Sequence, residues 1–213
     1  MLKRFLSHEK GITGLETAII LIAFVVVAAV FAYTALSAGL FSTQKAQEAV
    51  YSGLKEAQST VELKGGIIAT AGTTGATGAI KQISFVVANA LGGEPIDFTQ
   101  PTAPVTATGL ATGTANKVVI NYIDNVQTVS NLFWTVTKLG NDSGDYLLSS
   151  GEKYEITIGG SDNTSAPGNL INALTPDLSV NKTFSLQLVT PAGAVLTIER
   201  TTPAYIDTII NLR

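Results

Sequence analysis

The chain has no cysteine, and its one histidine, His8, lies close to the N-terminus. Without cysteine, neither disulfide bonds nor cysteine-ligated metal sites can stabilise the protein. If the first residues are removed, the histidine is lost as well, which excludes serine–histidine and cysteine–histidine nucleophile pairs and histidine-ligated zinc. The carboxylates fall in predicted turns or on polar strand faces without clustering, as solvated surface charges do. We therefore expect no enzymatic activity.

Charge is also scarce, since only 14% of the residues are charged and 46% are hydrophobic. The formal net charge is −3. Residues 1–11 carry Lys3, Arg4 and Lys10 against Glu9, a net +2, so their removal would take the charge to −5. A mildly acidic chain is a poor ligand for nucleic acid, and we expect no nucleic-acid partner.

Most of the apolar excess lies in residues 12–44, which contain a single charge, Glu16, and directly follow the basic leader 1–11. A secretory signal has an apolar stretch of only about 7–15 residues with a small-residue cleavage site after it. Here no A-x-A site closes the run before Lys45. Gly11 instead offers a small residue in front of it. We predict cleavage between Gly11 and Ile12, which keeps the apolar part.

Residues 12–64 are predicted to form one hydrophobic helix, continuous from Leu15 to about Leu63, because the stretch lacks proline. Its first half is apolar all round, whereas its second half has one apolar face. That face is formed by Ala46, Val50, Leu54, Ala57 and Val61. A helix of about 50 residues is about 75 Å long, roughly twice what a bilayer needs. We expect Gly65-Gly66 to end it.

Residues 65–213 are predicted to form a separate β domain, which makes the fold class α+β. Short alternating runs are separated by turn-forming sequences such as GGEP and TPAG. They predict an antiparallel β-sandwich or barrel. Tyr154, Ile156 and Ile158 should share one face of a strand, as should Phe184, Leu186 and Leu188. Further strands are expected at 80–88, 117–123, 132–137 and 194–199, with a hairpin over 189–195.

The first 60 or so residues closely resemble the archaellins, the flagellins of archaea, and more broadly the type IV pilin superfamily. The matching features are the basic leader ending in Lys10-Gly11, the Ile12-Thr13-Gly14 start, the carboxylate of Glu16 at the fifth mature position and the FVVVAAVFAY core. Glu16 is a hallmark of type IV pilins and occurs in only some archaellins. An adhesion pilus subunit therefore stays open as an alternative.

The resemblance implies a precursor in the cytoplasmic membrane that polymerises with itself, through its helix, into an extracellular filament for swimming. It also implies cleavage by a prepilin-type peptidase and assembly by a membrane platform with a cytoplasmic ATPase. The β domain would form the outer sheath. A signal-anchored surface protein that never polymerises is a further alternative.

A carboxylate in an apolar helix costs a few kcal/mol unless it finds a partner. Cleavage would place the α-ammonium of Ile12 four residues before Glu16, and in an assembly that partner could come from a neighbouring subunit. The resemblance implies that Glu16 helps to align incoming subunits. Alternatively, Glu16 lies at the membrane interface and only favours the helix N-terminus.

Two further groups of residues are candidate sites in the predicted exported part. Asn141, Asn163 and Asn181 each begin an N-x-[ST] sequon, so they are candidates for N-glycosylation. Oxygen ligands at Asn141, Asp142, Asp145 and Glu152 are spaced closely enough for a structural Ca²⁺. The same residue types are the usual turn formers, which makes a plain turn the alternative. No other cofactor is expected.

Overall fold

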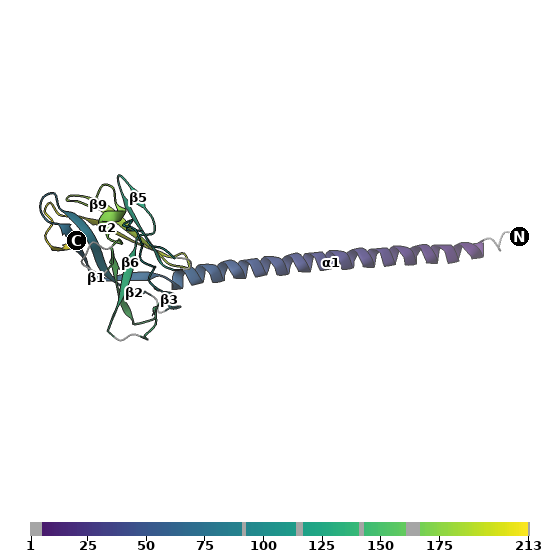
Figure 1. The fold of residues 1–213 in the computed structure, drawn as a ribbon. Coiled ribbons are helices and arrows are strands. Elements are labelled where there is room, and N and C mark those ends of the chain that lie inside the picture. The colour runs from purple at the N-terminus through teal and green to yellow at the C-terminus, as the bar shows by residue number, and fades with distance from the viewer. Residues whose placement is uncertain (1–5, 91–92, 114–116, 141–142, 161–166, 213) are drawn as a thin grey trace. The chain divides into compact units, whose positions relative to one another are not determined.

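The computed structural model describes residues 6–90, 93–113, 117–140, 143–160 and 167–212, with side chains from residue 14 onward. It divides into two units, Met1–Ser52 and Gly53–Arg213. The first consists of the helix α1 (Leu6–Gln58), whose last residues belong to the second unit. Figure 1 shows α1 as an uninterrupted helix. The fold class is confirmed as a long N-terminal helix followed by antiparallel β-sheets.

The predicted end of the helix is wrong. α1 ends at Gln58, and Val61 begins the strand β1 (Val61–Thr73) with only 4% of its surface exposed. The hydroxyls of Ser59 and Thr60 donate hydrogen bonds to the carbonyls of Glu56 (2.9 Å) and Ala57 (2.8 Å), which satisfies carbonyls left free at the helix end. Val61 fits the helical spacing equally well, so periodicity alone placed it on the helix.

The expectation that Gly65-Gly66 stops the helix is wrong as well, because both residues lie inside β1. The pairing of β1 with the strand β2 (Ala79–Asn89) shifts register between Lys64 and Ile68. Gly65 has a φ of +82°, which residues with a side chain rarely adopt. The glycine pair therefore forms an irregularity that bends a strand, the bulge role that glycine often has in sheets.

The β unit contains two larger antiparallel sheets and a small one (Figure 1). The first has the order β11-β1-β2-β8-β6, with β11 at Ile209–Leu212, β8 at Lys153–Ile158 and β6 at Trp134–Leu139. The second has the order β10-β9-β4-β5, with β10 at Val195–Thr201, β9 at Thr183–Val189, β4 at Val119–Asp124 and β5 at Thr128–Val129. The third pairs β3 (Ile96–Asp97) with β7 (Leu147–Leu148), and a short helix, α2, spans Leu170–Ala173.

The core of this unit is built from the inward faces of the two larger sheets. Tyr154, Ile156 and Ile158 of β8 are buried, and so are Phe184, Leu186 and Leu188 of β9, as their alternation predicts. The hairpin over 189–195 is confirmed by the pairing of Val189 with Val195. The arrangement is sandwich-like rather than a closed barrel, which decides between the two predicted architectures.

Aromatic side chains fill the centre of the sandwich. Trp134, the one tryptophan of the chain, is fully buried, and Phe98 meets it edge-on with 6.1 Å between ring centroids. Tyr122 stacks on Phe184 at 5.8 Å. Such pairs add about 0.5–1.5 kcal/mol beyond the burial of their area. Because Trp134 lies in this core, its fluorescence reports on the folding of the β unit alone.

Candidate assembly interface

The helix surface is the first candidate site, because every side chain from Gly14 to Ala57 is exposed in the single chain. The largest groups are the most accessible, with Phe24, Phe31 and Tyr33 between 73% and 75% exposed. Gly14–Gln58 is long and apolar enough to cross a membrane, by length and composition. Contiguous apolar surface of this extent marks a membrane or protein contact site in a native protein.

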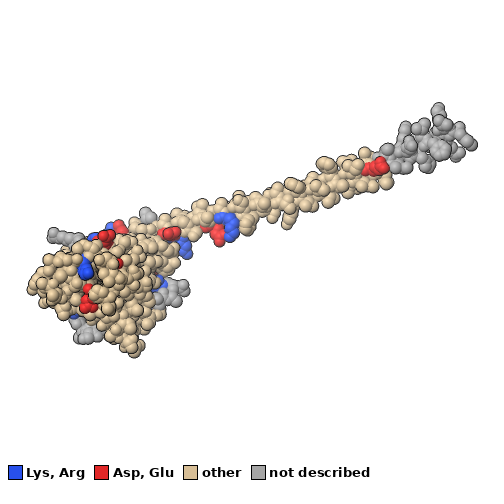
Figure 2. Space-filling model, turned by 90° about the horizontal axis from the view of Figure 1, so that it is seen from above, with Lys and Arg blue, Asp and Glu red and all other residues tan. Residues whose placement is uncertain are grey.

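Charge is absent from the central part of this surface. The sequence has no charged residue between Glu16 and Lys45, and the space-filling view shows a correspondingly long stretch of helix without blue or red atoms (Figure 2). The segment contains several hydroxyl groups, and those of its three threonines are hydrogen-bonded within the helix. Thr17, Thr34 and Thr43 donate hydrogen bonds to the carbonyls three residues earlier, at 3.2, 2.9 and 2.9 Å. These groups can therefore leave water without losing a partner.

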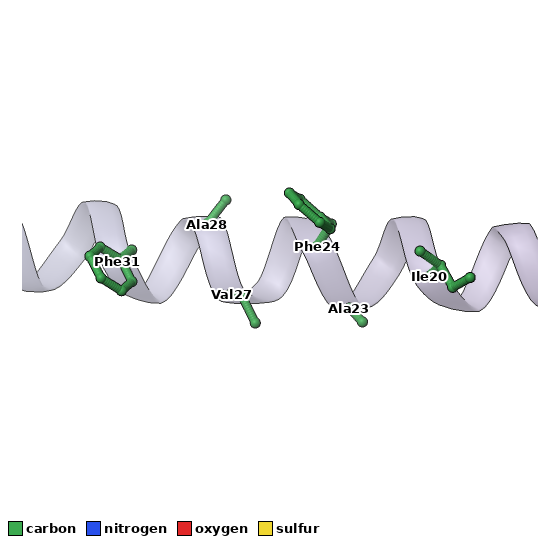
Figure 3. Close-up of a pocket in the computed structure, with 6 residues that line it drawn as sticks. All are labelled: Ile20, Ala23, Phe24, Val27, Ala28 and Phe31. Atoms are coloured by element: carbon green, nitrogen blue, oxygen red, sulfur yellow. The ribbon is translucent and has the colours of Figure 1, made fainter.

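One face of the helix carries a shallow hollow with walls of aromatic side chains. It is lined by Ile20, Ala23, Phe24, Val27, Ala28 and Phe31. Their spacing of three and four residues places them along one side of α1, and Figure 3 shows the small side chain of Ala28 between the rings of Phe24 and Phe31. A hollow between large side chains is the feature that receives a side chain of another helix in helix–helix packing.

The predicted processing and alignment residues all lie on α1. Gly11 and Ile12 have helical backbone, and their side chains lie outside the described part. Glu16 is exposed. Four residues of helix separate Ile12 from Glu16 by a rise of about 6 Å, so a terminal ammonium and this carboxylate can lie within one turn of each other.

The calcium candidates are only partly within the described residues, since Asn141 and Asp142 lie outside them. The Glu152 carboxylate, 8% exposed, accepts hydrogen bonds from the backbone N–H groups of Ser143 (2.7 Å) and Ser149 (2.8 Å). Asp145 accepts from the hydroxyl of Ser143 (2.8 Å) and from the N–H of Leu147 (3.0 Å). Among the described residues, no group of three or more acidic, histidine or cysteine side chains could hold a metal. Asp145 and Glu152 both accept hydrogen bonds from the loop backbone, as turn-forming side chains do.

These hydrogen bonds shift the acidity of both groups. The N–H of Ser149 lowers the pKa of Glu152 most, desolvation opposes this, and the N–H of Ser143 lowers it further, for a net decrease from its ordinary 4.5. The pKa of Asp145 is also lowered, chiefly by the N–H of Leu147 and then by the hydroxyl of Ser143. Both carboxylates therefore hold the loop in their ionised form.

Of the three sequons, only Asn181 lies within the described residues. Its side chain is exposed, and its φ of +53° belongs to the tight turn that precedes β9. The hydroxyl of Thr183, the third residue of this sequon, is hydrogen-bonded to that of Thr201 at 2.8 Å. Asn163 and Asn141 lie outside the described part of the chain.

The chain combines an apolar helix that is exposed on every side with a β-sandwich that has its own core. It therefore belongs to a class of proteins whose helix must be covered by lipid or by other chains. A family model for archaeal-type flagellin matches residues 11–200. The chain belongs to this family, and the resemblance seen in its first 60 residues is confirmed over nearly its whole length.

Two similar relatives are the probable flagellins 1 and 2 of Archaeoglobus fulgidus. The first is 38% identical over 98% of both chains, and the second is 38% identical over 94% of this chain and 93% of its own. The archaeal flagellum of Methanospirillum hungatei superposes with a TM-score of 0.59 at 28% identity, covering 93% of this chain and 98% of that one. The crystal structure of flagellin FlaB1 from Methanocaldococcus jannaschii, at 14% identity and a TM-score of 0.51, shares the fold.

These matches identify the chain as a flagellin, a structural subunit of the archaellum, and not as an enzyme. They favour the archaellum over the adhesion pilus, which the sequence had left open. The sequence did not predict the contact between Ser59, directly after α1, and Thr190, just after β9, because the helix was expected to continue past Gln58.

Replacing Glu152 by glutamine should lower the free energy of unfolding at pH 7 by about 1–3 kcal/mol, because two backbone N–H groups lose their charged acceptor. Since folding lowers the pKa of Glu152, its contribution is complete above pH 4.5 and is lost as the pH falls through the lower folded value. The deficit of the variant should therefore shrink in acid. Urea unfolding in detergent, followed by Trp134 fluorescence, measures it.

Glu155→Gln is the matched control, because Glu155 lies on the outward-facing side of β8, between the buried Tyr154 and Ile156. At pH 7 and in acid alike, the free energy of unfolding of Glu155→Gln should stay close to that of the wild type. Equal behaviour of the two variants would contradict the role given to Glu152.

Proposed function

We propose that the protein is inserted into the membrane as a precursor and then polymerises through residues 14–57 into an extracellular filament that drives swimming. The observation that carries this proposal is the exposure of α1 on all sides in the single chain. Lipid covers the apolar part of that surface in the membrane. Outside the membrane, only other copies of the same helix offer an equally long apolar surface.

The energy available from such packing is large. Covering residues 19–41 removes on the order of 1–2 thousand Å² of apolar area from water per subunit, which corresponds to tens of kcal/mol at about 25 cal/mol per Å² before the entropy costs of association. Alanine and glycine residues along this segment let helix axes approach closely, as in membrane bundles. A filament with a core of packed helices would therefore be very stable.

Maturation by cleavage between Gly11 and Ile12 completes this scheme. Residues 1–11 carry a net charge of +2, which suits the cytoplasmic side of a membrane. The family match begins at residue 11, directly at the proposed site. We assign the cleavage to a prepilin-type peptidase, and assembly to a membrane platform with a cytoplasmic ATPase, because the family resemblance implies these partners.

For Glu16 we propose a pairing role with the α-ammonium of Ile12 of a neighbouring subunit. The support is positional, since Glu16 is the one charged residue of the stretch 12–44 and lies one helical turn after the new terminus. An unpaired carboxylate inside an apolar bundle would cost several kcal/mol. The pairing would favour the one register in which both charges are satisfied.

We further propose that the exposed Asn181 carries a glycan on the filament surface, with Asn141 and Asn163 as further candidates. Its exposure in a tight turn leaves its side chain accessible. Peptide mass analysis of purified filaments tests this, and a peptide containing Asn181 at its unmodified mass would rule out modification of that residue.

Val26→Asp should abolish filaments and swimming while leaving the β unit folded. Val26 is 55% exposed in the single chain, so the substitution removes no packing within the subunit, whereas in a core of apolar helices it buries a charge without a partner. Electron microscopy and swimming assays measure the effect, with Val26→Leu as the apolar control. Filaments of Val26→Asp at wild-type yield would show that the helix does not form the core.

Gly11→Val should block maturation, because the peptidase must accommodate a branched side chain next to the cut. Mass analysis should then find full-length chain in the membrane fraction, whereas the wild-type filament protein should begin at Ile12. A Gly11→Val variant that still begins at Ile12 would overturn the assigned cleavage site.

Glu16→Ala should reduce filament yield without reducing membrane insertion, since alanine removes the pairing charge and leaves the helix more apolar. Glu16→Asp keeps the charge on a shorter side chain and should recover part of the yield. Quantified filament and membrane fractions provide the readout. If the alanine variant assembled as well as the wild type, Glu16 would have no pairing role.

A further inference from the structure

A second groove lies within the β unit, where the end of α1 meets the hairpin between β9 and β10. It is lined by Gly53, Glu56, Ala57, Thr60, Ala194 and Val195. One wall is therefore helical, and the other is the start of β10. Val195 contributes an apolar side chain that is 51% exposed.

Hydrogen bonds hold both walls in place. Ser59 follows directly on α1, and its hydroxyl lies 3.4 Å from that of Thr190, which is buried at the base of the hairpin. The N–H of Thr190 donates to the carbonyl of Ala194 at 2.9 Å, which closes the hairpin turn. On another side of the helix end, Lys55 pairs with Glu94 at 3.7 Å. The helical wall and the hairpin wall of the groove are thus joined by contacts within one unit.

Gly53 has no structural explanation within the subunit. It lies inside a helix, where glycine is the poorest helix former after proline, and its φ is not in the left-handed region. A Cβ added to Gly53 would meet nothing within 4 Å. The space above Gly53 is therefore open in the single chain, and the glycine is accounted for if another chain approaches the helix closely there.

The helical wall of the groove follows in sequence on the stretch of α1 assigned above to filament packing. Ala46, Ala49, Val50, Gly53 and Ala57 follow each other on one side of α1, with Lys55 on the opposite side. Val50 is 68% exposed. Gly53 and Ala57 form a small-xxx-small pair, the spacing at which helices pack closely. The surface that ends in the groove is thus suited to a helix rather than to an extended strand.

We propose that the groove receives the apolar part of α1 from a second copy of this chain, so that one neighbouring helix contacts both α1 and the β9–β10 hairpin. This inference rests on the proposed function and deepens it. It would link the helical core of the filament to the β domains, because the hairpin that touches the neighbour belongs to the sandwich. Glu56 would remain at the rim.

Gly53→Leu and Gly53→Ala test the proposal as a matched pair. Both replacements favour the helix of the single chain, but only leucine fills the groove. Filament yield of Gly53→Leu should fall at least tenfold, with membrane insertion and Trp134 fluorescence unchanged, whereas Gly53→Ala should lose much less, because one methyl group takes up only part of the space that a neighbouring helix needs. Equal yields of the two variants, with wild-type filaments present, would overturn the groove proposal alone. If the wild type formed no filaments, the proposed function itself would fail.

Disulfide trapping gives a second test, because the chain has no cysteine of its own. Subunits carrying Val195→Cys are co-assembled with subunits carrying a cysteine at Ala23, Ala28, Ala32 or Ala35, one position at a time. At least one pair should give a covalent dimer in filaments. Thr201→Cys, six residues and about 20 Å further along β10, is the control and should give none. If Val195→Cys gave no dimer with any of these positions, the groove would not hold a neighbouring helix.

Discussion

The rest of the structure depends on one constraint: the apolar surface of α1 must be kept out of water at every stage of the protein's existence. Within residues 14–57 no side chain is covered by the chain itself. A soluble monomer would expose about three quarters of the surface of Phe24, Phe31 and Tyr33. Lipid and other copies of the helix are the two environments that keep this apolar surface out of water. A basic leader with a small residue at Gly11 agrees with the proposed transfer from the membrane to the filament.

The β unit solves a different problem, because it must be stable in an extracellular setting without disulfides. It does so with an ordinary apolar core between two antiparallel sheets, filled by Trp134, Tyr122, Tyr154, Phe98 and Phe184. Carboxylates such as Glu152 fix its loops through backbone N–H groups. This separation lets the helix change its surroundings while the sandwich keeps one fold, so that substitutions on α1 can be read out as assembly defects rather than folding defects.

Much of this arrangement can be predicted from the sequence, since it follows from strong periodic signals. The uncharged run behind Glu16 predicts the helix, and the alternation of Tyr154, Ile156 and Ile158 predicts a half-buried strand. The junction could not be predicted in the same way. Val61 satisfies both the helical and the strand pattern, and only its burial in the sandwich decides between them. The pair Gly65-Gly66 is likewise compatible with the end of a helix or with an irregularity in a strand. The register shift in the pairing of β1 with β2 shows that it is an irregularity in a strand.

Cysteine accessibility in intact filaments tests the central claim most directly, because the natural chain contains no cysteine. Single cysteines replace Val26, on the uncharged stretch of α1, and Thr128, exposed at the start of β5. The account predicts that a water-soluble maleimide labels the Thr128 variant and leaves the Val26 variant unlabelled in filaments, and that the reagent reaches both after the filaments are dissociated in detergent. Rapid labelling of the Val26 variant in intact filaments would contradict it.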